Sequence, residues 1–303
     1  HTTVLRAVAV RPDGDRSEIM TRSYLHIPDL PTQSGAGFPA TWGLRDGRPV
    51  PADYAMDDTI TSAPQFQAKL AAAIGALPTL SLVLDPADLF NPLSGVYAHP
   101  MESGEAWEKP ASIEYFPAIR ASAGDPGFSV AAGLRIQGGW NRRPEESPKH
   151  SLRLIFRRRY GADRLRYPLF PGTPTEFSTL ILRGGNNNSW LHWSAGERRR
   201  ADYLRDEWMR RTSAALGNAA ARGRFVHVCL NGLYWGIYNL CERPDHAFAA
   251  GHLGGRAADY DSRNADKILN GDDAAWRSLL RLIESGAARN DFLQQVSDVL
   301  DVP

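Results

Sequence analysis

The sequence predicts an α+β fold, in which an antiparallel sheet carries one packed helix, with a β-hairpin at the N-terminus and a helical segment at the C-terminus. Three observations predict it. Short runs with alternating apolar residues recur between residues 80 and 241. One stretch in their midst, residues 198–216, has apolar residues at the spacing of a helix. Helical spacing then continues after Pro244. A period of two residues indicates strands and a period of 3.6 indicates helices.

Composition narrows the class of protein. The chain has 303 residues, of which 43% are hydrophobic, so it can bury a substantial core. Its formal net charge is +1, which creates no overall field to attract nucleic acid. We interpret the arginine triplets at 157–159 and 198–200 as solvated faces, and expect no nucleic-acid partner. No apolar run approaches the ~18 residues of a membrane span, so we expect no span in this chain.

The N-terminal part predicts two segments before the main domain. Residues 3–10 and 17–27 read as two strands around the turn at 11–15, and an isolated hairpin is unstable. We therefore interpret residues 1–27 as the end of an upstream β-domain. Residues 28–79 are rich in Pro, Gly, Ser and Asp up to about residue 65, and predict a linker with one short helix at 65–74.

The main domain is predicted at 80–250, followed by a helical segment at 251–303. Its helix at 198–216 is expected to bury a stripe that includes Leu204 and Trp208, so that Trp208→Ala should cost a few kcal/mol, as large aromatic truncations do. The helical pattern continues to the last residues, and we interpret the chain as a piece of a longer protein. The strands are expected at 80–84, 112–116, 128–136, 149–156 and 177–182, with a hairpin at 225–241.

Two cysteines flank the predicted Asn231-Gly232 turn of that hairpin. A two-residue turn places Cys229 opposite Tyr234 and Cys241 opposite Arg222. The thiols are then not cross-strand neighbours, and a disulfide would require irregular strands.

Five residues are candidates for chemistry. Lys149 precedes an alternating strand and follows the Gly138-Gly139 turn, so its ammonium is a candidate for contacting phosphate oxygens. An ordinary lysine at a sheet edge explains the pattern as well. Glu242 ends the hairpin and either pairs with Lys149 or caps a neighbouring element. Arg205 either organises a cleft or lies on the surface, with the aliphatic part of its side chain against the protein and its guanidinium group in water. Zinc, calcium-loop and serine-nucleophile motifs are not found.

Several stretches taken together resemble the spore-coat protein H (CotH-like) kinase family over roughly residues 80–255. The most specific part is the Asn-Gly-x-Tyr-x-Gly-x-Tyr hairpin with its trailing glutamate. The stretches are 134–139 (LRIQGG), 148–156 (PKHSLRLIF), 160–161 (YG), 203–206 (YLRD) and 230–245 (LNGLYWGIYNLCERPD).

This resemblance implies the small lobe of an atypical protein kinase, which transfers phosphate from ATP to serine or other hydroxyl side chains of a protein substrate. It also implies a divalent cation, Mg or Mn. By position in the motifs, Lys149 would contact the ATP phosphates. Gly138 and Gly139 would form the turn over the nucleotide, Arg205 would lie on the helix beside the cleft, and Glu242 would lead to the hinge.

The chain departs from the family in one large respect. The family's catalytic aspartate and its later metal-binding aspartates belong beyond residue 300, and no aspartate of this chain sits in such a motif. We therefore expect this polypeptide to be catalytically inactive, with its catalytic residues unknown. The alternative is a non-catalytic extracellular adhesion or scaffold module.

Residues 1–27 resemble the last strands of a chitobiase C-terminal-type β-sandwich. That module often precedes such kinase domains in large secreted or surface proteins. The resemblance therefore implies an extracellular, cell-surface or spore-coat location.

Overall fold

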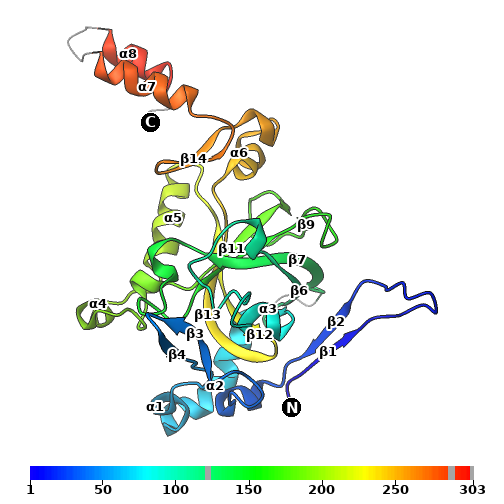
Figure 1. The fold of residues 1–303 in the computed structure, drawn as a ribbon. Coiled ribbons are helices and arrows are strands. Elements are labelled where there is room, and N and C mark those ends of the chain that lie inside the picture. Colours follow the sequence, from blue (N-terminus) through cyan, green and yellow to red (C-terminus); the bar gives the residue numbers. More distant parts are fainter. Residues whose placement is uncertain (120–123, 286–290, 301–303) are drawn as a thin grey trace. The chain divides into compact units, whose positions relative to one another are not determined.

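A computed structural model describes residues 1–119, 124–285 and 291–300, and the chain divides into two compact units, 1–243 and 244–303 (Figure 1). Helices and strands occur in both units, which confirms the predicted α+β class. The predicted boundaries at residues 27, 79 and 250 stay predictions.

The first unit is organised around a closed barrel of seven strands, in the order β11-β13-β12-β5-β6-β7-β8. Neighbouring strands are antiparallel except for β12 and β5, which run parallel. The predicted antiparallel sheet is therefore corrected in two respects, since it closes on itself and contains a parallel pair. The strands are β5 (Thr79–Val83), β6 (Lys109–Phe116), β7 (Phe128–Gln137), β8 (Ser151–Ile155), β11 (Thr179–Arg183), β12 (Gly223–Leu230) and β13 (Leu233–Glu242).

Alternation along the strands builds the core of the barrel. In β8, Leu152 and Leu154 point inward and are almost completely buried, as their period of two predicts. Leu182 and Leu240 face each other across β11 and β13, and both are buried. The residues that alternate with these leucines along each strand point to the outer face of the barrel. That outer face is where the candidate site lies.

Segments before β5 pack against the barrel, although their composition indicated a linker. Residues 41–51 form a hairpin, and its Trp42 is buried against Tyr97 and Trp235. The Trp235 Nε1 donates a hydrogen bond to the Tyr97 hydroxyl at 2.7 Å. The elements of this region are β3 (Thr41–Arg45), β4 (Arg48–Pro51), α1 (Asp58–Thr61) and α2 (Pro64–Ala76), with a 3-10 turn at Ile27–Thr32. Between β5 and β6 the chain forms α3 (Pro86–Phe90) and a 3-10 turn at Glu105–Trp107.

The predicted N-terminal hairpin forms, with β1 (Thr3–Ala7) antiparallel to β2 (Met20–Tyr24). Two hydroxyl contacts attach it to the barrel. The Thr21 Oγ1 lies 2.8 Å from the Ser112 Oγ, and the Ser23 Oγ lies 2.8 Å from the Ser81 Oγ. Its role as the end of an upstream domain stays a prediction.

The β12–β13 hairpin turns at Asn231 and Gly232, both with positive φ, as an Asn-Gly turn requires. Cys229 lies opposite Tyr234, as predicted. Cys241 lies opposite Gly223 instead of Arg222, because a bulge at Val228/Cys229 shifts the register by one residue. Both thiols are free and buried.

The predicted helix at 198–216 is two helices, α4 (Ala195–Arg199) and α5 (Arg205–Ala215). The predicted buried stripe is wrong. Trp208 is 62% exposed, and Leu204 is exposed as well. The residue of α5 that is buried is Glu207, so the helix turns a polar face to the barrel. Further short elements are β9 (Leu165–Arg166), β10 (Glu176–Phe177) and 3-10 turns at Trp140–Arg142 and Asn186–Asn188.

The second unit is mainly helical, as predicted for the end of the chain. Among its described residues, Leu279 of α7 is the one hydrophobic residue that is buried. In the described part of the whole chain, no helix has both the length and the apolar character needed to cross a membrane. The unit contains α6 (His246–Leu253), a 3-10 turn at Ala257–Asp259, β14 (Ser262–Asn264), β15 (Lys267–Asn270), α7 (Ala274–Glu284) and α8 (Phe292–Ser297).

Candidate functional site

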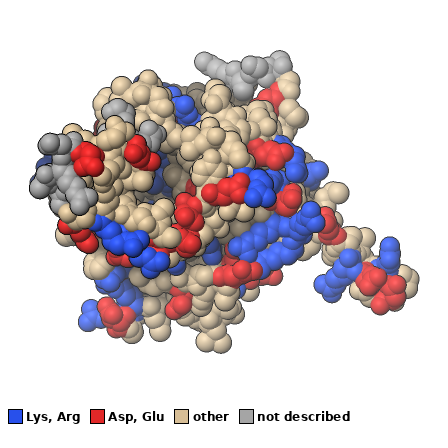
Figure 2. All heavy atoms as spheres, turned by 90° about the horizontal axis from the view of Figure 1, so that it is seen from above, with Lys and Arg blue, Asp and Glu red and all other residues tan. Residues whose placement is uncertain are grey.

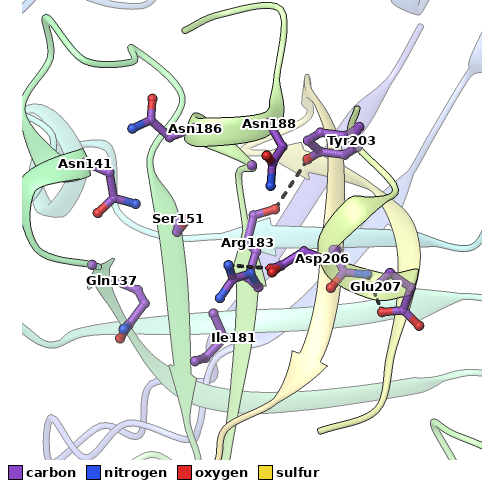
Figure 3. Close-up of a pocket in the computed structure, with 13 residues that line it drawn as sticks. Gln137, Asn141, Ser151, Ile181, Arg183, Asn186, Asn188, Tyr203, Asp206 and Glu207 are labelled. Atoms are coloured by element: carbon purple, nitrogen blue, oxygen red, sulfur yellow. Dashed lines mark hydrogen bonds and ion pairs between the residues drawn. The ribbon is translucent and has the colours of Figure 1, made fainter. Parts of the chain in front are cut away.

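A polar pocket of about 210 Å³ lies on the outer face of the barrel, between the strands β7, β8, β11 and β13 and the helix α5 (Figure 3). Amide side chains dominate its lining, together with one arginine and two carboxylates. Outward-pointing residues of the four strands form its floor, since they alternate with the buried core residues. Its main polar side chains are Gln137, Asn141, Ser151, Arg183, Asn186, Asn188, Tyr203, Asp206, Glu207 and Asn239.

The charged centre of this pocket is an ion pair between a strand and a helix. The Nη2 of Arg183, the last residue of β11, lies 2.5 Å from the Oδ2 of Asp206 in the first turn of α5. Both side chains are a little under half exposed. Figure 3 shows the two pointing at each other across the pocket. A guanidinium held in this way keeps further N–H donors for an anionic ligand, because it has five.

A second charged network fixes α5 against β13. The buried Glu207 accepts hydrogen bonds from Arg210 at 2.7 Å, from Arg211 at 2.7 Å and from the Asn239 amide at 3.1 Å. Burial by itself raises the pKa of Glu207, but these hydrogen bonds and the two arginine charges lower the pKa below its usual value. Glu207 is therefore ionised and anchors the helix that presents Asp206.

Like charges are neighbours on the floor beside the pocket. Arg135 of β7 and Arg153 of β8 are directly opposite each other in the register. The Arg153 Nε donates to the Gln137 Oε1 at 2.7 Å, and Arg135 lies 4.0 Å from the buried Glu108. Like charges placed directly opposite destabilise a sheet. The contacts with Glu108 and Gln137 offset part of this repulsion.

The Gly138-Gly139 turn covers one end of the pocket. Gly138 has a φ of +128°, and a Cβ there would lie 2.2 Å from the Asn141 Oδ1, so only glycine fits. The same oxygen accepts a hydrogen bond from the Gly139 N–H at 3.0 Å. Arg142 ties the turn down by donating to the carbonyls of Glu102 and Ile136. The turn is thus a fixed part of the pocket.

Lys149 lies two residues before β8, on the inner side of the barrel end. Its ammonium donates to the Ile237 carbonyl and lies over the ring of Tyr238, 4.5 Å from the centroid. The Tyr203 hydroxyl donates to the same carbonyl at 2.7 Å. Burial lowers the pKa of Lys149 to about 7. The lysine is therefore half-buried in an aromatic environment.

Glu242 is buried at the end of β13, and its Oε2 accepts from the backbone N–H of Arg222 at 2.9 Å. It is five residues along the strand from Ile237, whose carbonyl binds Lys149. At about 3.3 Å per residue, the two groups are roughly 16 Å apart along β13. The structure therefore does not bring Lys149 and Glu242 together.

Arg205 begins α5 and is exposed, with its Nη1 donating to the Asn188 Oδ1 at 3.2 Å. Asn188 lines the pocket, so this arginine lies beside it. Of the predicted site residues, Gly138 lines the pocket, and Gly139 and Arg205 contact residues that do. Their predicted roles in binding a nucleotide stay predictions.

Sequence reasoning missed the Arg183–Asp206 pair. One signal was available, because Asp206 closes the YLRD stretch at 203–206 that the family resemblance already included. Arg183 ends a short apolar run and carries no motif. Their proximity depends on how α5 packs on the sheet, which residue spacing does not specify.

A metal was implied by the resemblance, and the described residues do not supply a site for one. They contain no group of three or more histidine, cysteine, aspartate or glutamate side chains that could hold an ion. We therefore derive no step through a metal from these residues.

Comparison with known proteins identifies the family of the chain. No curated protein matches the chain. The model of the family described as CotH kinase protein matches residues 134–303, a range that contains the glycine turn, the pocket and the second unit. Because that range is more than half of the sequence, the chain belongs to the CotH kinase family.

Proposed function

We propose that the seven-stranded barrel and the elements packed on its outer face form the nucleotide-binding lobe of a CotH-like atypical protein kinase. The parent protein would transfer phosphate from ATP to hydroxyl side chains of surface or coat proteins, with a divalent cation. The observation that carries the proposal is the Arg183–Asp206 ion pair between β11 and α5, in an amide-lined pocket closed at one end by the Gly138 turn. Phosphoryl transfer depends on such positioning and charge neutralisation.

The residues around the pocket suit a polyphosphate. Arg183 offers a planar set of donors, and the neighbouring Arg135 and Arg153 place two more guanidinium groups on the same face of the sheet. Arginine binds phosphate oxygens through paired N–H donors. Asparagine and glutamine amides add neutral donors around them. An anion bound here would relieve the repulsion between Arg135 and Arg153.

Lys149 remains the residue that the motif assigns to the ATP phosphates. Its ammonium is held by Ile237 and two tyrosine rings, so contact with a phosphate would require it to leave these partners. We therefore assign the main phosphate contact to Arg183. Lys149 supports the strand β13 that forms the wall of the pocket.

Titration of a fluorescent ATP analogue tests the assignment. Arg183→Ala should weaken binding by about tenfold or more, because hydrogen bonds to a charged group contribute about 1.5–3 kcal/mol. The matched control is Arg158→Ala on an exposed turn, with a side chain 88% exposed, which should bind like the wild type. Lys149→Ala should weaken binding less than Arg183→Ala. The reverse order would overturn the assignment to Arg183.

The transfer step itself is assigned to no residue of this chain, and we expect no phosphate transfer from this polypeptide. Incubation with radiolabelled ATP and a general protein substrate checks this expectation. Incorporation above that of the Arg183→Ala variant would contradict it. A radiolabelled assay of the longer parent, comparing the wild type with Lys149→Ala, would then show whether phosphate transfer depends on Lys149.

A non-catalytic adhesion or scaffold role is the second candidate. One observation favours it, since Trp190, Trp193 and Trp208 are all more than 60% exposed. Tryptophan is enriched at interaction surfaces and rarely left open to water. Failure of the ATP analogue to bind the wild type would favour this second role.

A further inference from the structure

An exposed apolar tip lies in the loop before α4. Residues 189–194 place Trp190, Leu191 and Trp193 in solvent, with 66%, 45% and 62% of their surfaces exposed. The segment that contains α4 projects from the side of the barrel in Figure 1. Neither of the two pockets described for the first unit includes these three side chains. The tip is thus a protrusion of the surface.

The tip is held in place by polar contacts behind it. Arg198 of α4 donates to the backbone carbonyls of His192 and Trp193 at 2.7 and 2.8 Å. The Leu191 N–H donates to the Ser189 hydroxyl at 3.3 Å, and that serine is buried. Trp190 stacks on Tyr203 with an angle of 25° between the rings. The apolar side chains are therefore presented in solvent by a fixed backbone.

The apolar surface continues onto the outward face of α5. Leu204 and Trp208 lie one helical turn apart there, and both are exposed, as is Met209. Leu204 follows directly on Tyr203, the residue on which Trp190 stacks. We call the exposed apolar residues of the tip and of this part of the chain the tryptophan surface. Its members are Trp190, Leu191, Trp193, Leu204, Trp208 and Met209.

Arginines border the tryptophan surface. Arg199 and Arg200 end α4, and Arg205 and Arg211 lie on α5, all of them exposed. Arg211 contacts Glu207 and Arg200 contacts Glu197, while Arg199 has no acidic partner among the described residues. Over residues 183–216 basic side chains outnumber acidic ones. On the face drawn in Figure 2, basic and acidic side chains lie next to one another.

We propose that the tryptophan surface binds peripherally to an anionic phospholipid bilayer. Tryptophan prefers the interface between lipid headgroups and water, and leucine and methionine insert below it. Each arginine near an anionic membrane surface adds about 1 kcal/mol of attraction. The surface lies beside the pocket, because Trp190 stacks on Tyr203, and Tyr203 lines the pocket. Bilayer binding would thus hold the pocket close to a membrane.

Two other occupants fit the surface less well. A sugar would need several free polar groups beside the tryptophan rings for its hydroxyls, whereas Trp193 stacks on the His192 ring and Trp190 stacks on Tyr203, whose hydroxyl already donates to the Ile237 carbonyl. A protein partner would usually bind tryptophan anchors in pockets of its own and bury a broad, flat surface. A protruding tip with a border of arginines matches the shape and charge of a lipid headgroup layer better.

Co-sedimentation with vesicles tests the proposal on the intact chain. Vesicles of phosphatidylcholine alone are compared with vesicles that also contain phosphatidylglycerol. We expect binding to the mixed vesicles only, and weaker binding at high salt. The double variant Trp190→Ala/Trp193→Ala should lower the partition coefficient by about tenfold or more. Arg199→Ala should lower it by about fivefold.

Matched controls distinguish binding through this surface from nonspecific binding of the protein to vesicles. Trp140→Ala removes a tryptophan of similar exposure (63%) from the glycine turn, and Arg158→Ala removes an exposed arginine from another loop. Both should bind vesicles like the wild type. Unchanged melting midpoints of all variants establish that they are folded.

Three outcomes would overturn the proposal. They are equal binding by the Trp190/Trp193 double variant and the wild type, equal binding to vesicles without phosphatidylglycerol, and self-association of the wild type that the double variant abolishes. The last would assign the surface to a second copy of the chain. The ATP-analogue titration is independent of all three, so either proposal can fail alone.

Discussion

The environment of Lys149 sets the proton affinity of its amine. The ammonium has one carbonyl partner, that of Ile237, and lies against the rings of Tyr203 and Tyr238. Removal from water disfavours the charged form, and burial lowers the pKa of Lys149 from 10.5 to about 7. The amine is therefore about half neutral near pH 7. The neighbouring His150 is buried too, and burial, with a smaller contribution from the Arg142 charge, lowers its pKa to about 4.

This shift predicts a pH dependence of stability that belongs to Lys149. The unfolded chain keeps the lysine proton up to about pH 10.5, whereas the folded chain releases it near pH 7. The unfolded state binds more protons in this window, so the free energy of unfolding of the wild type should rise between pH 7 and 10.5. Lys149→Met lacks this contribution. The stability difference, wild type minus variant, should therefore increase by about 2 kcal/mol across the window.

Urea unfolding of both proteins at several pH values between about 6 and 10 measures this difference. Lys69→Met, on an exposed position of α2, is the control and should show no such trend. A difference between wild type and Lys149→Met that stays constant with pH would contradict the burial of the ammonium.

At the scale of single elements, α5 is attached to the barrel by charge and not by apolar contact. Its large apolar residues, such as Trp208 and Met209, are exposed, while Glu207 is 6% exposed. Glu207 receives hydrogen bonds from two arginines of its own helix and from Asn239 of β13. Gly223 makes room for it, since a Cβ there would lie 2.6 Å from the Glu207 Oε2. One carboxylate thus determines how the helix sits on the sheet.

We expect Glu207→Ala to destabilise the protein by about 3 kcal/mol, because it leaves Arg210 half-buried without its acidic partner. Thermal and urea unfolding measure the loss. Glu197→Ala is the matched control, since Glu197 also pairs with an arginine three residues ahead but is exposed, and it should cost about 0.5 kcal/mol or less.

A second control is the next residue of the same helix, whose side chain points about 100° away from that of Glu207. Trp208→Ala should change stability by about 0.5 kcal/mol or less, because its side chain is exposed. A loss from Trp208→Ala larger than that from Glu207→Ala would show that α5 is attached by its apolar face after all.

Strands were easier to predict from the sequence than this helix, for a physical reason. In a strand such as β8, alternate residues enter the hydrophobic core, and the positions of Leu152 and Leu154 show this directly in the sequence. For α5 the helical spacing of Leu204 and Trp208 was also real, but spacing only says that residues share a face. It does not say whether that face meets the core or the solvent. The way the helix packs decides which face is buried, and here the α5 residue that packs against the barrel is Glu207.

The candidate site shows the same limit. Gly138 was predictable, because a turn with positive φ favours glycine. The pairing of Arg183 with Asp206 joins a strand end to a helix start 23 residues later, and depends on barrel closure. The pairing of Lys149 with Glu242, one of the two predicted alternatives, is not formed, because Lys149 contacts Ile237 in the middle of β13 and Glu242 lies at the end of that strand. Local pattern fixes which residues face outward, but not which of them meet.

For the whole molecule, the two units differ in how much apolar surface they bury. The first unit contains nearly all of the buried hydrophobic residues, among them Leu134, Leu154, Val226 and Tyr238. In the second unit, α7 has a well-separated apolar face, yet Trp276, Leu280 and Ile283 on it are exposed, and Leu279 alone of the described residues there is buried. The free energy that holds α7 folded is therefore small compared with that of the barrel.

Hydrogen exchange followed by mass spectrometry should resolve this difference. Amides of α7 should exchange through local opening, at least ~100-fold faster than those of β7 and β8, which need global unfolding of the barrel. Leu154→Ala, in the core, should speed exchange in the barrel strands and cost about 2–5 kcal/mol. Leu279→Ala should speed exchange in α7 and leave the barrel amides unchanged, because the two residues belong to different units. Equal protection of α7 and β8 in the wild type would mean that the second unit unfolds only together with the first, and that its apolar face has a partner.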